Sequence, residues 1–306
     1  MPRIKIEAPA KLNLHLKVGD RRPDGFHDIE SLFLALAFWD TLYLETTPSE
    51  TMIPPEIRMD WQSSGPSPAI PPEKNIISRA VSLFRERTGF NQGLKVTVEK
   101  RIPPGGGLGG GSSDAAAALL AINRLAADGG LLDSAELLEM GASLGSDVPF
   151  FMYKTPAAWV SGRGERIQPI ELPEAMRKLA FVLVNPGFPS DTAEAYRLLD
   201  SWREGRREEG GGVPPGGWLS SLFPTSLFLA PHFFNDFLPV LSDSDKGPVY
   251  QRMIDELRKL GADFAGLSGS GSTCFGVFSG QEQAEAAREV LSKSWPFVIF
   301  SFLLVC

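Results

Sequence analysis

The sequence has little cysteine and no metal-binding cysteine pattern. Its two cysteines, Cys274 and Cys306, lack the spacing of a metal site or a redox motif. A chain of 306 residues buries enough apolar surface to fold without disulfides or a structural metal. We therefore expect a protein of the reducing cytoplasm.

The sequence also lacks a long hydrophobic run and an excess of positive charge. Residues 1–7 have no uninterrupted apolar core of a signal peptide. The most apolar segment, residues 296–306, is about half as long as a membrane span and is typical of a buried terminal strand. The net charge of −7 argues against a nucleic-acid coat protein. We expect neither a membrane nor a nucleic acid as partner.

Strand-like and helix-like patterns alternate along both halves of the chain. Residues 11–18 alternate apolar and polar side chains, which predicts a strand with one buried face. Residues 75–88 have the apolar spacing of a helix, and residues 94–98 alternate again as a strand. We find no internal repeat. The pattern predicts an α/β or α+β protein with a boundary near residues 154–165.

The most informative stretch is the glycine-rich segment 105–111, with six glycines in seven positions. Such a segment is kept where the backbone needs unusual torsions or a very close approach. It lies between a predicted strand and an alanine-rich helix, for which Ser112 or Ser113 is the expected cap. Unpaired N–H groups and the helix dipole would then point at one place, which favours a phosphate.

Three alternative roles for this segment fit its surroundings less well. A flexible linker is seldom flanked by periodic elements on both sides. A Walker A loop needs a lysine at its end, and no lysine follows before Lys154. A dinucleotide fingerprint needs an acidic residue at a strand end about twenty residues on, where this sequence is still helical. A second glycine-rich turn, residues 267–273, could close over the same phosphates.

Three segments taken together resemble the GHMP kinases. Residues 8–14 (APAKLNL), 103–116 and 267–275 are similar to the first, second and third motifs of that family, in the same order. The resemblance implies an α+β, two-domain GHMP kinase fold. Residues 1–160 would form an N-terminal domain like the second domain of ribosomal protein S5. Residues 161–306 would form a ferredoxin-like α/β sandwich.

Two more segments, residues 21–27 (RRPDGFH) and 145–151 (GSDVPFF), resemble one branch of the family. The resemblance implies a cytoplasmic monomer or homodimer whose small-molecule substrate carries a cytidine diphosphate group. Phe26 stands where tyrosine is usual, so the ring face is kept and the hydroxyl contact is lost. Two alternatives are a member acting on mevalonate, homoserine or a sugar, and a catalytically dead regulator. The segment with His27 argues against the first, and Lys11 with Asp147 against the second.

The resemblance also implies residue roles in a phosphate transfer from ATP. Asp147 would take the proton of the acceptor hydroxyl, and Lys11 would lie beside it and keep the carboxylate ionised. Without the resemblance, Asp147 is better explained as a turn or cap residue, and Lys11 fits a solvated sheet face about as well. A Mg²⁺ ion would accompany ATP, but no carboxylate cluster marks its site, and Ser112 or Ser113 could help to hold it.

The resemblance implies two further groups of contacts. His27 would hydrogen-bond the cytosine edge, and Phe26 and Phe188 would stack on its two faces. Phe188 fits core filler equally well, and Thr192 fits a helix cap. The candidate substrate contacts are Asn13, Phe26, His27, Phe188 and Thr192. The candidate nucleotide contacts are Asn75, which is otherwise a helix cap, and Pro103, Pro104, Gly105, Gly106, Gly107, Leu108, Gly109, Gly110, Gly111, Ser112 and Ser113.

Overall fold

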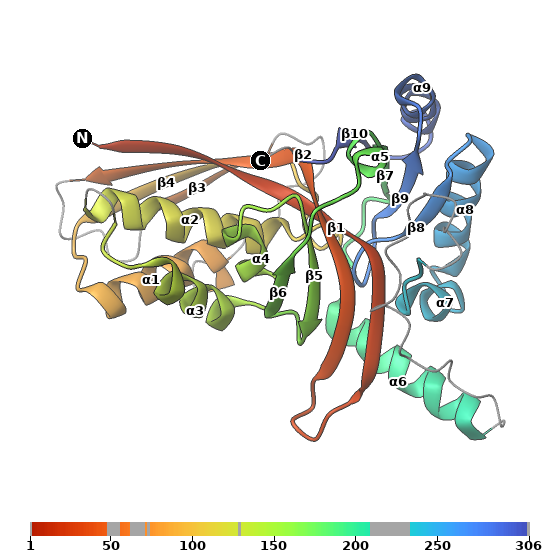
Figure 1. Cartoon of the computed structure of the whole chain (residues 1–306), viewed down its shortest axis with the longest axis horizontal. Helices are drawn as coiled ribbons and strands as arrows, with labels where there is room; N and C mark the ends of the chain where they lie inside the picture. The colour runs from red at the N-terminus through yellow and green to blue at the C-terminus, as the bar shows by residue number, and fades with distance from the viewer. Residues whose placement is uncertain are drawn as a thin grey trace.

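The computed structural model describes residues 2–47, 56–61, 71, 74–127, 130–208 and 233–304. Cys306 lies outside them. The described residues form two sheets, each with helices packed on it (Figure 1). None of the described helices is both long and apolar enough to span a membrane.

The first sheet contains the two longest strands, β1 (Arg3–Arg21) and β2 (His27–Thr47). Its order is β3-β4-β2-β5-β6, and β1 pairs with β2 in antiparallel fashion. The shorter strands are β3 (Glu56–Trp61), β4 (Gly93–Lys100), β5 (Ala157–Gly162) and β6 (Arg166–Pro169). β1 and β2 extend together beyond the rest of the sheet as a long hairpin toward the second half of the chain (Figure 1).

The alternation along residues 11–18 is confirmed as part of β1, with a difference in burial. The apolar set from Leu12 to Val18 is buried, but Lys11, Asn13 and His15 on the other face are buried as well, at 4%, 3% and 1% exposure. The interpretation of Lys11 as a residue on a solvated sheet face is therefore wrong. A buried ammonium needs polar partners, and those partners lie in the site described below.

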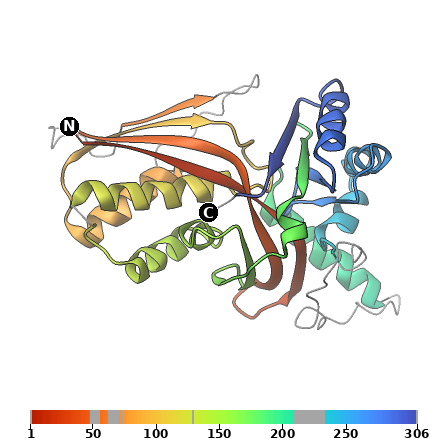
Figure 2. The same cartoon turned by 45° about the horizontal axis from the view of Figure 1, so that its top comes forward.

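Helices cover one face of the first sheet (Figure 2). They are α1 (Ile76–Thr88), α2 (Gly110–Ala126), α3 (Ser134–Leu144) and the short α4 (Val148–Met152). α2 packs against β1 and β2 and contacts both α1 and α3, which also contact each other. Its buried face is made largely of alanine, and such small side chains allow the helix to approach β1 closely.

The second sheet is antiparallel, with the order β10-β7-β9-β8. Its strands are β7 (Ala180–Asn185), β8 (Phe264–Leu267), β9 (Cys274–Phe278) and β10 (Phe297–Phe302). The helices of this half are α5 (Glu174–Arg177), α6 (Thr192–Glu208), α7 (Phe237–Ser242), α8 (Gly247–Lys259) and α9 (Gln281–Leu291). α8 and α9 pack on the sheet, whereas α6 runs past the β1–β2 hairpin (Figure 1).

The extent of the two sheets indicates where one domain ends and the next begins. The expected boundary between residues 160 and 161 falls inside β5, which pairs with β2, and β6 pairs with β5. The first sheet therefore extends to Pro169, and the second begins at Ala180. We propose that the domain boundary lies between these two residues.

Candidate functional site

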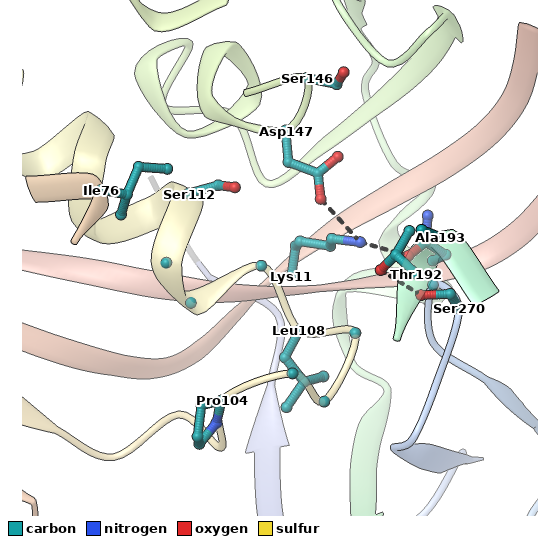
Figure 3. A pocket seen from close by; sticks show the side chains of 18 of the residues that line it. Lys11, Ile76, Pro104, Leu108, Ser112, Ser146, Asp147, Thr192, Ala193 and Ser270 are labelled. Atoms are coloured by element: carbon teal, nitrogen blue, oxygen red, sulfur yellow. Dashed lines mark hydrogen bonds and ion pairs between the residues drawn. The ribbon is translucent and has the colours of Figure 1, made fainter. Parts of the chain in front are cut away.

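A cavity of about 1040 Å³ lies where the glycine-rich loop, the β1–β2 hairpin and the start of α6 meet. Figure 3 shows Lys11, Asp147, Thr192 and Ser270 converging on it from four separate segments of the chain. One end is walled by the loop 103–112, and the other by the residues around His27. The two ends are described in turn.

The backbone of the glycine-rich loop alternates into the left-handed region. Gly105, Gly107 and Gly109 have φ of 65°, 75° and 69°. A Cβ at Gly107 would lie 2.1 Å from the carbonyl oxygen of Ser268, so no side chain fits there. The prediction of unusual torsions and close approach is confirmed at this glycine.

The second glycine-rich turn lies against the first, as the sequence predicted. The Ser268 hydroxyl donates to the carbonyl of Gly107 at 2.8 Å, and the N–H of Thr273 donates to the carbonyl of Gly106 at 3.2 Å. On the other side, the N–H of Lys11 donates to the carbonyl of Leu108 at 2.9 Å. The loop is therefore fixed between β1 and the turn 267–273, and it is no flexible linker.

The helix after the loop starts earlier than the sequence predicted. α2 begins at Gly110, and its N-cap residue Gly109 is left-handed with no side-chain cap bond, so the expected cap at Ser112 or Ser113 is wrong. Ser112 lines the cavity. Ser113 is 1% exposed, is not among the cavity-lining residues, and its hydroxyl has no hydrogen-bond partner among the described residues. A direct contact of the Ser113 side chain with a nucleotide is therefore not supported.

Lys11 and Asp147 meet across the cavity, as expected. Lys11 Nζ lies 3.3 Å from Asp147 Oδ2 (Figure 3). It also donates to Asn13 Oδ1 at 2.7 Å. The Asn13 amide in turn donates to the Ser31 hydroxyl at 2.9 Å, which fixes its orientation. Asp147 lies in the turn before α4, at the N-cap position, as the alternative interpretation expected, but its side chain makes no cap bond and is free to face Lys11.

The far end of the cavity is built around His27. Its Nε2 donates to Asp200 Oδ1 at 2.9 Å, and its ring stacks on Tyr196 with centroids 4.9 Å apart and planes 28° apart. Phe26 is 53% exposed, and the Arg163 guanidinium lies 4.8 Å from its ring centroid. All five residues line the cavity.

Sequence reasoning missed three of these residues, Arg163, Tyr196 and Asp200. Tyr196 and Asp200 are four positions apart on α6, a spacing that puts two side chains on one helix face. That spacing was the available signal, but nothing in it points toward His27. Burial, together with the negative charge of Asp147, raises the pKa of Tyr196 to about 12, so its hydroxyl stays protonated at neutral pH.

Phe188, an expected substrate contact, does not line the cavity. Its ring packs edge-on against Tyr250 at 6.2 Å between centroids, with Lys246 Nζ 4.7 Å from its centroid, and it is absent from the cavity lining. These contacts favour the alternative of a packing residue for Phe188, and the stacking of a base between Phe26 and Phe188 stays a prediction. The second aromatic ring of this end of the cavity is Tyr196, because α6 turns this residue toward His27.

Asn75 and Thr192 were both possible helix caps, and only Asn75 acts as one. Asn75 does cap α1, accepting from the N–H of Ile77 at 2.9 Å, and it also lines the cavity. Thr192 does not act as the cap of α6, because Asp191 accepts from the N–H of Glu194 at 3.1 Å. The Thr192 hydroxyl instead lies 2.9 Å from that of Ser270, at the cavity wall (Figure 3).

A buried charge cluster under the loop was also missed. Lys100 Nζ donates to Asp40 and, at 2.6 Å, to Asp114 Oδ2, and Asp40 also accepts from the N–H of Ile102 at 2.9 Å. Burial raises the pKa of Asp114 to about 7, Lys100 opposes the shift, and the charge of Asp40 adds to it. Asp114 Oδ1 is buried without a hydrogen-bond partner in the described part of the chain.

The side chains around the cavity show which atoms could bind a metal ion. No group of three or more His, Cys, Asp and Glu side chains that could hold an ion occurs among the described residues. Side chains with oxygen donors that line the cavity beside the loop include Ser112, Asp114 and Asp147, of which Asp114 accepts from Lys100. These are hard oxygen donors, which suit a Mg²⁺ ion that takes most of its ligands from phosphate and water.

Comparison with known proteins shows what the chain is similar to. The family model of the N-terminal domain of GHMP kinases matches residues 75–155, and that of the GHMP kinase C-terminal region matches residues 237–296. The 4-diphosphocytidyl-2-C-methyl-D-erythritol kinase of Methylococcus capsulatus is 35% identical over 300 residues, covering 98% of this chain and 91% of that protein. The enzyme of the same name from Treponema pallidum is 37% identical over 306 residues, covering 96% and 97%.

Solved structures agree with these matches. A crystal structure of 4-(cytidine 5'-diphospho)-2C-methyl-D-erythritol kinase is similar with a TM-score of 0.75 and 31% identity, over 99% of this chain and 100% of that one. Homoserine kinase from Cytophaga hutchinsonii has a TM-score of 0.67 at 20% identity, over 99% of this chain and 95% of its own. At this identity, the similarity to homoserine kinase shows a shared fold and nothing more.

Proposed function

Because the chain belongs to the 4-diphosphocytidyl-2-C-methyl-D-erythritol kinase family of the GHMP kinases, we propose that it transfers the γ-phosphate of ATP to the 2-hydroxyl of 4-diphosphocytidyl-2-C-methyl-D-erythritol, in the non-mevalonate isoprenoid pathway. The chain has the two-domain α+β fold of that family. The observation that supports the proposal best is the contact of Lys11 with Asp147 beside the glycine-rich loop.

Phosphate transfer to an alcohol needs an electrostatic cradle and in-line placement of the reacting groups. The loop 103–112 supplies backbone N–H groups and the positive end of α2, which face the cavity and suit the phosphates of ATP. Close packing against Ser268 holds the loop in this shape before the nucleotide arrives. A preformed cradle pays no ordering cost at the moment of reaction.

Asp147 is the proposed general base, and Lys11 its positioning partner. The carboxylate makes no cap bond that would compete, and the ammonium 3.3 Å from Oδ2 is its ion-pair partner among the described residues. An acceptor hydroxyl placed between Asp147 and the loop would lose its proton to the carboxylate as its oxygen attacks the γ-phosphate. Lys11 also lies where it can stabilise the negative charge on that oxygen.

A Mg²⁺ ion bound with ATP would neutralise part of the phosphate charge. Ser112 and Asp147 line the cavity and would offer oxygen donors to this ion, whereas the Asp114 carboxylate, which also lines it, is already bonded to Lys100. The Ser112 hydroxyl and the Asp147 carboxylate come from α2 and from the turn before α4. α2 packs on β1 and β2 of the first sheet, and α4 packs on α2 and α3.

The far end of the cavity suits the cytidine of the acceptor. Phe26 and Tyr196 present aromatic rings, His27 offers ring nitrogens, and Arg163 brings a positive charge that suits a diphosphate. Mevalonate and homoserine carry no base to occupy this end. The ring-lined end therefore favours the cytidyl substrate over those of other GHMP kinases.

The test is a coupled assay of ADP release with purified protein, ATP and Mg²⁺. The acceptors are 4-diphosphocytidyl-2-C-methyl-D-erythritol, mevalonate, homoserine and galactose. We expect release with the first acceptor alone. Release with another acceptor would assign the chain a different substrate, and no release with any acceptor would leave a nucleotide-binding protein without kinase activity.

A further inference from the structure

We propose that Asp200 is a positioning residue that fixes the tautomer of His27, and that this tautomer lets the site distinguish cytosine from uracil. The inference rests on the proposed function, because it concerns the base of the cytidyl substrate. It goes beyond that function because it assigns the selection to a carboxylate on α6 that need not touch the substrate.

One turn of α6 holds the imidazole at two points. Tyr196 stacks on the ring of His27, and Asp200, four residues later, accepts from its Nε2 at 2.9 Å. The stack fixes the plane of the ring and the hydrogen bond fixes its rotation within that plane. The side chain of His27 is 5% exposed, so the ring has little room to turn.

The partner of Nε2 decides which nitrogen of a neutral imidazole carries the proton. A carboxylate only accepts hydrogen bonds, so Asp200 requires the hydrogen on Nε2. Nδ1 is then left with a lone pair and acts as an acceptor. No described residue hydrogen-bonds to Nδ1, and His27 lines the cavity.

Cytosine and uracil differ at the position where such an acceptor matters. Cytosine carries a 4-amino group, which is a donor, whereas uracil carries a carbonyl oxygen, which is an acceptor. A lone pair on Nδ1 accepts from the amino group and repels the carbonyl. A site whose polar group is left unpaired by the wrong ligand rejects it strongly. The His27–Asp200 pair therefore selects a cytidyl over a uridyl group.

The tautomer can be measured without any substrate. The chain has three histidines, so ¹⁵N-labelled imidazoles give few signals in long-range ¹H–¹⁵N correlation spectra, and His27→Ala identifies the one that belongs to His27. We expect the wild-type protein at a pH where His27 is neutral to show the hydrogen on Nε2, and Asp200→Asn to show a mixture, because an amide can donate as well as accept. A hydrogen on Nδ1 in the wild type would overturn the proposal.

The selectivity is measured as the ratio of kcat/KM for the cytidyl acceptor to that for its uridyl analogue. We expect the wild type to favour cytidyl, and Asp200→Asn to lower that preference at least about tenfold with an unchanged KM for ATP. Glu204→Gln is the matched control. It removes a carboxylate from the same helix one turn later, outside the cavity lining, and should keep the wild-type ratio.

A double variant separates an indirect effect from a direct one. In a His27→Ala background, Asp200→Asn should leave the ratio unchanged, because there is no tautomer left to fix. If Asp200→Asn lowers the ratio fully in that background, Asp200 contacts the base itself. If Asp200→Asn alone leaves the ratio unchanged, Asp200 plays no part in choosing cytidyl over uridyl. Either result overturns the proposal. A wild type inactive on both acceptors would instead count against the proposed function, while the spectra would still decide the tautomer.

Discussion

The two ends of the cavity are built in different ways. The end proposed for the phosphates, called the phosphate end here, is built mainly from the backbone of the loop 103–112, which packs against the turn 267–273. The base end consists of side chains from segments far apart in the chain, with His27 at the start of β2, Arg163 between β5 and β6, and Tyr196 and Asp200 on α6. The shape of the phosphate end depends on backbone torsions and close contacts that few residue types permit. The shape of the base end depends on which side chains the fold brings together.

This difference has a consequence for substitutions. At Gly107 a single added carbon meets the backbone carbonyl of Ser268, so the damage falls on folding and on chemistry together. At the base end a changed side chain removes one contact and leaves the backbone intact. Variants at this end should therefore alter affinity and selectivity more than stability.

The largest effect is expected where the two ends meet, at Asp147. Asp147→Asn removes the proposed base but keeps the size of the side chain, so kcat should fall at least about a hundredfold with a small change in the KM for ATP. Steady-state kinetics measure both. Asp245→Asn, an exposed carboxylate outside the cavity lining, is the control. A near-normal kcat in the Asp147 variant would remove this residue from the mechanism.

The next effect tests the rigidity of the phosphate end. Gly107→Ala places a Cβ 2.1 Å from the Ser268 carbonyl oxygen at a φ of 75°, and we expect a loss of at least about 2 kcal/mol in the free energy of unfolding. Gly111→Ala is the matched variant. Its nearest neighbour would be 3.9 Å away, and α2 should gain up to about 1 kcal/mol. Equal unfolding midpoints in denaturant would contradict the close packing of the loop.

A smaller effect concerns the charge cluster below the loop. The pKa of Asp114 is raised from 3.8 to about 7, chiefly by burial, so the folded chain binds a proton between these values that the unfolded chain releases. This contribution to stability is therefore lost as the pH rises from about 4 to 7. Asp114→Asn has no such proton and does not lose this contribution, whereas the wild type does. The melting temperature of the variant minus that of the wild type should therefore increase by at least about 2 °C between pH 5 and pH 8. A difference independent of pH would show that Asp114 stays charged throughout.

The same comparison explains how much could be predicted from the sequence. The glycine-rich loop and its place before α2 followed from local order, because six glycines in seven positions leave few other uses. The contact with the turn 267–273 was only a hypothesis, since the two segments are far apart in the chain. The strands and helices that flank it followed from periodicity. The start of α2 did not, because a left-handed Gly109 takes the cap position and makes Ser112 and Ser113 part of the helix.

The base end could not be predicted from local order. Phe188 and Tyr196 are both aromatic and lie close together in the chain, and only the packing of α6 shows that Tyr196 reaches His27 while Phe188 packs against Tyr250. The cluster of Lys100, Asp40 and Asp114 joins β4, β2 and α2, so its members carry no common pattern. Family resemblance supplied Lys11 and Asp147, and the geometry shows that they are in contact.

The smallest effect decides between the two aromatic assignments at the base end. Phe26→Ala removes a half-exposed ring at the cavity wall, and the KM for the cytidyl substrate should rise about tenfold, since stacking on a base contributes about 1–3 kcal/mol. Phe188→Ala should lower the unfolding midpoint and leave that KM unchanged, because its ring packs against Tyr250 away from the cavity. Initial-rate kinetics and thermal melts on both variants make the comparison. A KM that rises with Phe188→Ala and not with Phe26→Ala would mean that the base stacks on Phe188 and not on Phe26.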